Sequence, residues 1–174
     1  MKAPEIIETE RLSLRRLVMA DAQAVFDMNA HPDVVRHMTR TPSTEMADTV
    51  GFLERCQRVW DEGDAFTWAI TLEGGVVGTI EARNSRHGVE LGYLLDRSVW
   101  GNGYMLEAGH AVTEWAMGDP TVFRVWAFTN VGNTASQKVL EGLGMTREGR
   151  LHRWVPQPNV APIPADAYIY ALWR

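Results

Sequence analysis

The sequence predicts an α/β fold, a mixed and mostly antiparallel sheet of six or seven strands with about four helices. Apolar-rich segments separated by glycine turns in the middle of the chain predict an antiparallel meander. A later strand, glycine loop, helix and strand follow in the order of a βαβ crossover, so the fourth and fifth strands should be parallel. The length of 174 residues and the 45% hydrophobic content favour one domain over residues 1–174.

The first strand and two helices are expected before residue 65. Leucines that alternate with polar residues over 12–17 predict the strand. Asp21 should cap a short helix over 22–30, which Pro32 ends because the residue before proline avoids the α region. Thr41 and Pro42 are typical of a helix start, and the apolar stripe behind them predicts a second helix that ends at residues 62–64.

The remaining elements follow from alternation and from glycine. Three strands are expected over 66–72, 76–80 and 88–95, with a hairpin turn at 73–75. Helical spacing over 105–118 predicts the third helix, and 123–128 is rich in strand-forming residues. Asn133 should cap a fourth helix over 134–143, closed by Gly144. Two last strands, 151–155 and 167–173, surround a proline-rich loop.

Composition excludes several classes of protein. With 22 acidic residues against 17 Lys and Arg, the net charge is −5, which argues against a nucleic-acid partner. No apolar run is long enough to span a bilayer, and residues 1–16 lack the apolar region of a secretory signal, so no membrane partner and a cytoplasmic location are expected. One Cys excludes an internal disulfide, and the five His form no metal-binding motif, so no metal is expected.

A glycine loop is the first candidate site. Gly101-Asn102-Gly103 directly follows a strand and opens a helix. Main-chain N–H groups at a helix N-terminus can hold a pyrophosphate without any Lys, and glycine allows close approach. A plain tight turn is an equally good interpretation of this loop alone.

Four segments together resemble the GNAT superfamily of acetyl-CoA-dependent N-acetyltransferases. They are Glu90–Leu95, Trp100–Ala108, Asn133–Ser136 and Leu143–Met145. The opening Thr9–Arg15 and the Trp-Gly-x-Gly-Tyr loop are similar to the branch that acetylates ribosomal-protein N-termini, such as an N-terminal alanine. The resemblance covers nearly the whole chain.

The resemblance implies a set of cofactor-binding residues. Main-chain groups of Tyr93, Leu94 and Leu95 would pair with the pantetheine arm of acetyl-CoA, inserted where the fourth and fifth strands splay apart. The loop Trp100, Gly101, Asn102, Gly103, Tyr104 and Met105 would hold the pyrophosphate, although Met105 is bulkier than the family's usual residue. Asn133 and Ser136 would flank the arm from the other side. Lys138 would reach the adenosine phosphate or, alternatively, is an ordinary solvated helix residue.

Two residues are candidates for catalysis. An amine attacks a thioester only when neutral, so a base or a chain of water molecules must remove its proton, and Glu90 on the fourth strand is the candidate base. The alternative is a carboxylate paired with Arg. Many relatives carry a Tyr seven residues after the Asn as proton donor to the thiolate, where this chain has Leu140. Ser136 is then the candidate donor, with a structural helix hydroxyl as the alternative.

The resemblance therefore predicts an enzyme that moves acetyl from acetyl-CoA to a primary amine by direct attack in a ternary complex. The acceptor would be a protein N-terminus or a small amine. A non-catalytic acyl-CoA-binding or regulatory module is the alternative function, and a homodimer is left open. Cys56 has no His at useful spacing, which argues against a covalent acetyl-cysteine route.

Overall fold

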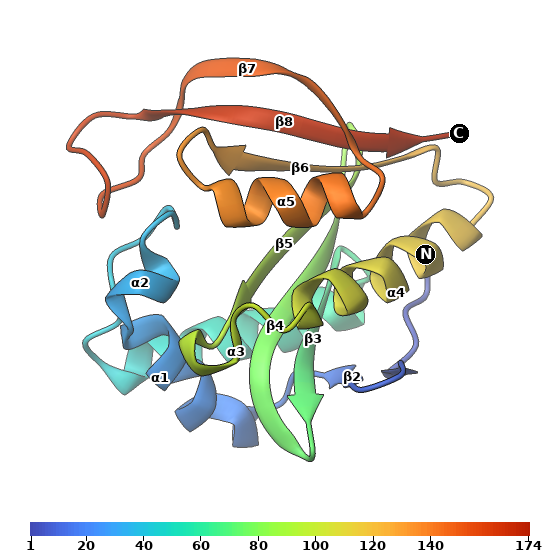
Figure 1. Ribbon diagram of the computed structural model, residues 1–174. Helices are drawn as coiled ribbons and strands as arrows, with labels where there is room; N and C mark the ends of the chain where they lie inside the picture. Colours follow the sequence, from blue (N-terminus) through green and yellow to red (C-terminus); the bar gives the residue numbers. More distant parts are fainter.

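An eight-stranded sheet runs through the molecule in the order β1-β2-β3-β4-β5-β6-β8-β7 (Figure 1). The computed structural model describes residues 1–174. The strands are β1 (Ile6–Glu8), β2 (Ser13–Arg16), β3 (Ala65–Leu72), β4 (Gly75–Ser85), β5 (Gly88–Leu95), β6 (Arg124–Asn130), β7 (Thr146–Val155) and β8 (Ala165–Trp173). The helices are α1 (Ala22–Ala30), α2 (Pro32–Val35), α3 (Met46–Glu62), α4 (Tyr104–Gly118) and α5 (Thr134–Gly142).

The α/β class and the mostly antiparallel sheet are confirmed, but both element counts were too low. The unpredicted strand is β1, a three-residue edge strand too short to show an alternating pattern. The unpredicted helix is α2: Pro32 does follow the end of α1, but it also begins a new turn, in which the His31 side chain accepts a hydrogen bond from the Asp33 N–H.

The predicted start of the second long helix was wrong. Thr41 and Pro42 lie outside regular structure, and α3 begins at Met46 after the extended Glu45. A tertiary contact explains the difference, because the Ser43 N–H donates to the Asn29 carbonyl at the end of α1. The end of α3 is as predicted, with Gly63 in the left-handed region.

The predicted parallel pairing of the fourth and fifth strands is confirmed between β5 and β6. It is very short, since only Val89 pairs with Val125 and Glu90 with Trp126. Beyond these pairs β5 stays with β4 as far as Leu95, whereas β6 pairs with β8 along its whole length. The two strands therefore splay apart towards their C-terminal ends, and we call the place where they diverge the splay.

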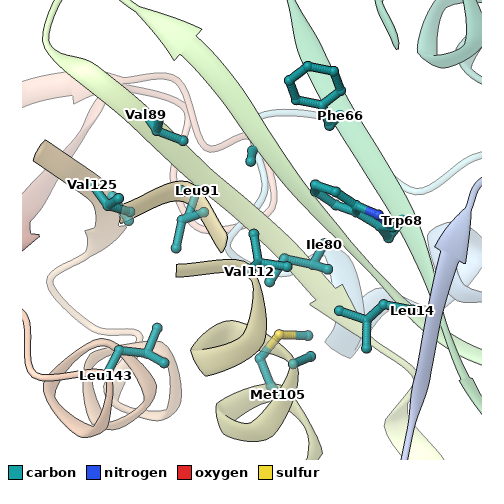
Figure 2. Close-up of a cluster of buried hydrophobic side chains, with 14 of the residues drawn as sticks. Leu14, Phe66, Trp68, Ile80, Val89, Leu91, Met105, Val112, Val125 and Leu143 are labelled. Atoms are coloured by element: carbon teal, nitrogen blue, oxygen red, sulfur yellow. The ribbon is translucent and has the colours of Figure 1, made fainter. Parts of the chain in front are cut away.

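Helices cover both faces of the sheet. Figure 1 shows α4 and α5 in front of the central strands and α3 behind them, and α1 packs with α3. The face under α4 and α5 holds a core cluster of 21 buried residues, in which Val112 of α4 lies beside Ile80 of β4 (Figure 2). The opposite face has a cluster of only six: Leu17, Val25, Met28, Leu53, Cys56 and Ala69. We call these the α4–α5 face and the α3 face, respectively.

Each helix in the structure falls short of the length and apolar character that crossing a membrane requires.

Candidate active site

The glycine loop predicted from the sequence stands at the N-terminus of α4, next to the splay. Gly101 and Gly103 have φ angles of 83° and 80°, in the left-handed region that side chains rarely adopt. Between them, the Asn102 side-chain amide donates to the carbonyls of Val99 and Trp100. The loop is thus folded back on itself, with open space beside Gly101 where a Cβ would stand.

The first turn of α4 offers free main-chain donors. The Glu107 N–H bonds to the Gly103 carbonyl, so the N–H groups of Tyr104, Met105 and Leu106 have no acceptor inside the helix. The bulky side chain of Met105 is 6% exposed and packs into the core cluster. It therefore leaves the loop clear, and the positive end of the helix dipole is available to an anion.

Trp100 ties the loop to the end of β5. Its indole N–H donates to the Leu95 carbonyl at 2.8 Å, and the Arg97 guanidinium lies 4.7 Å from its ring centre. Both contacts hold the loop close to the splay.

The N-terminal segment also forms hydrogen bonds to the glycine loop and to the first turn of α4, and these contacts were not predicted from the sequence. Glu107 accepts hydrogen bonds from the Thr9 hydroxyl at 2.6 Å and from the Arg11 side chain at 2.7 Å, while Arg11 also donates to the Asn102 carbonyl at 3.0 Å. Desolvation opposes ionisation of Glu107, but the bonds from Thr9 and Arg11 prevail and hold its pKa below the usual value. Arg11 thus compensates a carboxylate that would otherwise repel a phosphate at this helix end.

The main chain of β5 faces two neighbours in alternation. The Asp96 N–H donates to the Val77 carbonyl of β4, and alternate residues of a strand face the same neighbour. Leu94 accordingly faces β4, whereas the N–H and C=O groups of Tyr93 and Leu95 face the splay. β6 does not pair these groups; the Leu95 carbonyl accepts the Trp100 indole N–H, which leaves the Leu95 N–H and the main chain of Tyr93 facing the splay.

Across the splay, α5 brings Ser136 to the Tyr93 side chain. Asn133 caps α5 as predicted, because its side-chain oxygen accepts the Ser136 N–H at 3.2 Å. The Tyr93 hydroxyl and Ser136 Oγ lie 2.9 Å apart. Burial raises the pKa of Tyr93 to about 12, against the lowering effect of this hydrogen bond. A role for the Tyr93 hydroxyl was missed, although the alternation of β5 places this side chain on the same face as Leu91.

Two other sequence-predicted positions lie on α5. Leu140 is fully buried in the core cluster, so an apolar side chain stands where many relatives carry a Tyr. Lys138 is exposed and has no ion-pair partner.

Glu90 projects from the other face of β5, among charged residues of β4. Arg83 forms a close ion pair with Glu81, but its nearest nitrogen is 3.9 Å from the Glu90 carboxylate. Desolvation raises the pKa of Glu90; the Arg83 charge opposes this rise and the Glu81 charge adds to it. The side chain is 20% exposed, so solvent still reaches it. The sequence pointed to Glu90 but gave no sign of Glu81 and Arg83 beside it.

The arrangement can therefore bind an anionic, extended molecule and deprotonate a group next to it. The splay separates a basic carboxylate, Glu90, on the α3 face from two hydroxyl groups, those of Tyr93 and Ser136, on the α4–α5 face. No three His, Cys, Asp or Glu side chains are grouped as ligands of a metal ion would be.

Comparisons with known proteins show the family of this chain. The family model of the acetyltransferase (GNAT) domain matches residues 11–146. A relative from Bacillus licheniformis, named uncharacterized N-acetyltransferase p20, is 30% identical over 98% of this chain and 97% of its own. The crystal structure of a GNAT-family acetyltransferase from Bacillus anthracis has a TM-score of 0.85 at 26% identity, covering 97% of this chain and 98% of its own.

A further solved structure shares the fold at lower identity. It is RimL, described as a ribosomal L7/L12 α-N-protein acetyltransferase in complex with coenzyme A, with a TM-score of 0.88 at 20% identity over 97% of this chain and 98% of its own. With a family model over most of its length and a relative that spans nearly all of it, this chain belongs to the GNAT family of acetyltransferases.

Proposed function

We propose that this protein transfers the acetyl group of acetyl-CoA to a primary amine by direct attack. The observation that carries the proposal is the splay between β5 and β6, which begins directly after the Glu90–Trp126 pair and lies beside the glycine loop of α4. The family match over residues 11–146 and the continuous sheet from β1 to β8 support one catalytic domain over residues 1–174.

The residues around the splay fit acetyl-CoA. Tyr93 and Leu95 would pair with the amides of the pantetheine arm, as an added strand does, and Leu94 would line the acceptor side. The loop from Trp100 to Met105 would bind the pyrophosphate through main-chain N–H groups, which suits a protein with a charge of −5. Asn133 would stand at the far side of the arm, and Lys138 would be free to reach the adenosine phosphate. The coenzyme A bound to RimL supports this choice of substrate.

Glu90 would act as the base. The acceptor amine reacts only without its extra proton, and a carboxylate with a raised pKa takes up a proton more readily than an ordinary surface Glu. The 3.9 Å contact with Arg83 is too long for a close ion pair, so the carboxylate is available to the amine. Cys56 is buried in α3, and burial raises the pKa of its thiol, which favours direct transfer over an acetyl-cysteine route.

Ser136 would donate a proton to the departing thiolate, and Tyr93 would orient it. The Tyr93 hydroxyl can donate to Ser136 Oγ, which leaves the Ser136 proton free to point into the splay. The main-chain carbonyl of Ser136 is 3.4 Å from the same hydroxyl and is the weaker acceptor.

We expect Ser136→Ala to lower kcat about tenfold with saturating acetyl-CoA, and Tyr93→Phe to lower it less, because Ser136 keeps its proton in the second variant. The double variant should be no slower than Ser136→Ala, since Tyr93 acts through Ser136. Steady-state kinetics on the four proteins checks this, with KM for acetyl-CoA as the control on binding. Wild-type turnover in Ser136→Ala would leave this hydroxyl a structural one.

The acceptor would be a protein N-terminus or a small amine. The resemblance of Thr9–Arg15 and of the Trp-Gly-x-Gly-Tyr loop to ribosomal-protein acetyltransferases supports a protein N-terminus, as does the fold shared with RimL. The two carboxylates, Glu81 and Glu90, suit a cationic amine on the same face.

Two measurements test the proposed function. At 100 times Kd, acetyl-CoA should stabilise the protein by about 2.7 kcal/mol, a rise in Tm of about 5–10 °C for a chain of this size. A thiol-release assay with peptides, polyamines and aminoglycosides should then identify an acceptor. Tight binding with no thiol release for any amine would favour a non-catalytic acyl-CoA-binding module, and the absence of a Tm shift would contradict both.

A further inference from the structure

One half-buried cation in this protein differs from the others in having no carboxylate partner. Four of the Lys and Arg side chains are half-buried. Three are paired: Arg15 with Asp21, Arg16 with Asp61 and Arg124 with Glu148. The fourth, Arg40, has no carboxylate within 4.0 Å, in a chain that carries five more negative than positive charges.

The surroundings of Arg40 leave most of its guanidinium unused. One nitrogen donates to the side-chain oxygen of Asn29 at 2.6 Å, and that neutral amide is its one side-chain partner. Burial lowers the pKa of Arg40, and the charge of Arg55 lowers it further. Buried charges in proteins are normally paired, because water no longer stabilises them. A guanidinium has five donors in a planar fork that matches carboxylate and phosphate oxygens.

Arg40 belongs to the segment between α2 and α3, which hydrogen bonds fix to the loop between β7 and β8. The Asn159 side-chain amide, in the loop between β7 and β8, donates to the carbonyls of Arg40 and Val35 at 2.7 and 2.8 Å. The same loop is fixed to the end of β6 by the hydrogen bond between Asn130 and the buried Gln157. In Figure 1 this loop, at the left, reaches down beside α2.

The other diverging strand is linked to the same segment. Arg97, just after β5, lies 3.7 Å from Asp33 of α2. Leu94 of β5 packs against the small cluster that includes Met28, next to Asn29. The segment around Arg40 therefore bridges the ends of β5 and β6 on the face that carries Glu90.

We propose that Arg40 binds an anionic group, a carboxylate or a phosphate, carried by the amine acceptor. The inference rests on the proposed function, in which Glu90 takes the amine end of the same molecule. Binding supplies the charge partner that this protein gives to its three other half-buried arginines. The acceptor is thereby restricted to amines with an anionic group, whether a small molecule or a peptide with an acidic side chain near its N-terminus.

Matched acceptors test this assignment. Ethanolamine, which is neutral apart from its amine, is compared with O-phosphoethanolamine and with β-alanine. The peptide amide Ser-Asn-Ala is compared with the peptide amide Ser-Asp-Ala; these two peptides differ by one charge. We expect at least one anionic member to have a kcat/KM ten or more times that of its neutral partner, since hydrogen bonds to charged groups are the strong ones. The member that responds identifies phosphate, small carboxylate or peptide side chain as the source.

Variants connect the preference to Arg40. Arg40→Gln should remove the preference, measured as the ratio of kcat/KM for the charged and the neutral acceptor, and Arg40→Lys, which keeps the charge, should retain part of it. Arg58→Gln is the matched control, because Arg58 is exposed on α3 and pairs with Glu62. Equal rates for charged and neutral acceptors, or a preference that survives Arg40→Gln, would overturn the assignment.

Calorimetric titration of the anionic amines into the CoA-bound protein separates this inference from the proposed function. Binding that depends on Arg40 without thiol release for any amine would support the anion site and contradict the acetyltransferase proposal. Neither binding nor release would overturn both.

Discussion

Glu90→Gln is expected to lower kcat at neutral pH at least tenfold. The substitution keeps the shape of the side chain and removes its ability to take the proton of the acceptor amine. Burial and the neighbouring Glu81 raise the pKa of Glu90 above the value of an ordinary Glu, which is about 4.3. The wild-type rate should therefore rise with pH as Glu90 loses its proton at this raised pKa. In the variant this acid limb should disappear, and the remaining rate should follow ionisation of the amine itself. A pH–rate profile of kcat from pH 5 to 9 measures both effects.

Glu81→Gln is the matched control for the Glu90 prediction. It removes the charge that repels the Glu90 carboxylate and frees Arg83 to approach it, so both effects lower the pKa of Glu90. The acid limb should therefore shift to lower pH and remain visible. A profile in Glu90→Gln that coincides in shape with that of the wild type would remove Glu90 from the mechanism.

Gly88→Ala is expected to destabilise the protein by about 4 kcal/mol, the largest effect we predict for a single methyl group. Gly88 has a φ of 104°, where other residues are strained. A Cβ there would overlap the Arg124 carbonyl oxygen, so β5 and β6 would have to separate at the one place where they pair. Urea denaturation, followed by the fluorescence of the seven tryptophans, among them the buried Trp68, measures the loss.

Gly92→Ala is the control for Gly88→Ala in the same strand. A Cβ at Gly92 would have no neighbouring atom within 4 Å, and the φ of Gly92 is not positive, so the free energy of unfolding should change by less than about 1 kcal/mol. Equal stability of the two variants would show that the β5–β6 contact is not tightly constrained at Gly88.

Local patterns predicted most of this fold. The glycines at 101 and 103, the Asn133 cap and the βαβ order are short-range signals, and each stands in the structure where it was expected. The wrongly predicted start of α3 shows that a tertiary contact can override such short-range signals. Thr41-Pro42 has the chemistry of a helix start, but the bond from Ser43 to α1 decides the conformation.

Less of the candidate site than of the fold could be predicted from the sequence, and the reason is the same. Glu90 and Ser136 were identified by position in a motif, whereas their neighbours come from other strands and helices. The contacts of Arg83 with Glu90, of Tyr93 with Ser136 and of Arg11 with Glu107 join residues whose relation only the folded chain defines. The isolation of Arg40 is likewise a property of three dimensions, since an unpaired charge cannot be recognised until every neighbour is known.

The unequal clusters on the two faces of the sheet have an evolutionary consequence. The α4–α5 face rests on 21 buried residues, and a substitution there disturbs many neighbours at once. The α3 face rests on six, and hydrogen bonds from the Asn159 side chain to Val35 and Arg40 join α2 and the segment after it to the loop between β7 and β8. We therefore expect that a few substitutions on the α3 face can change the acceptor, whereas substitutions on the α4–α5 face should be tolerated less often.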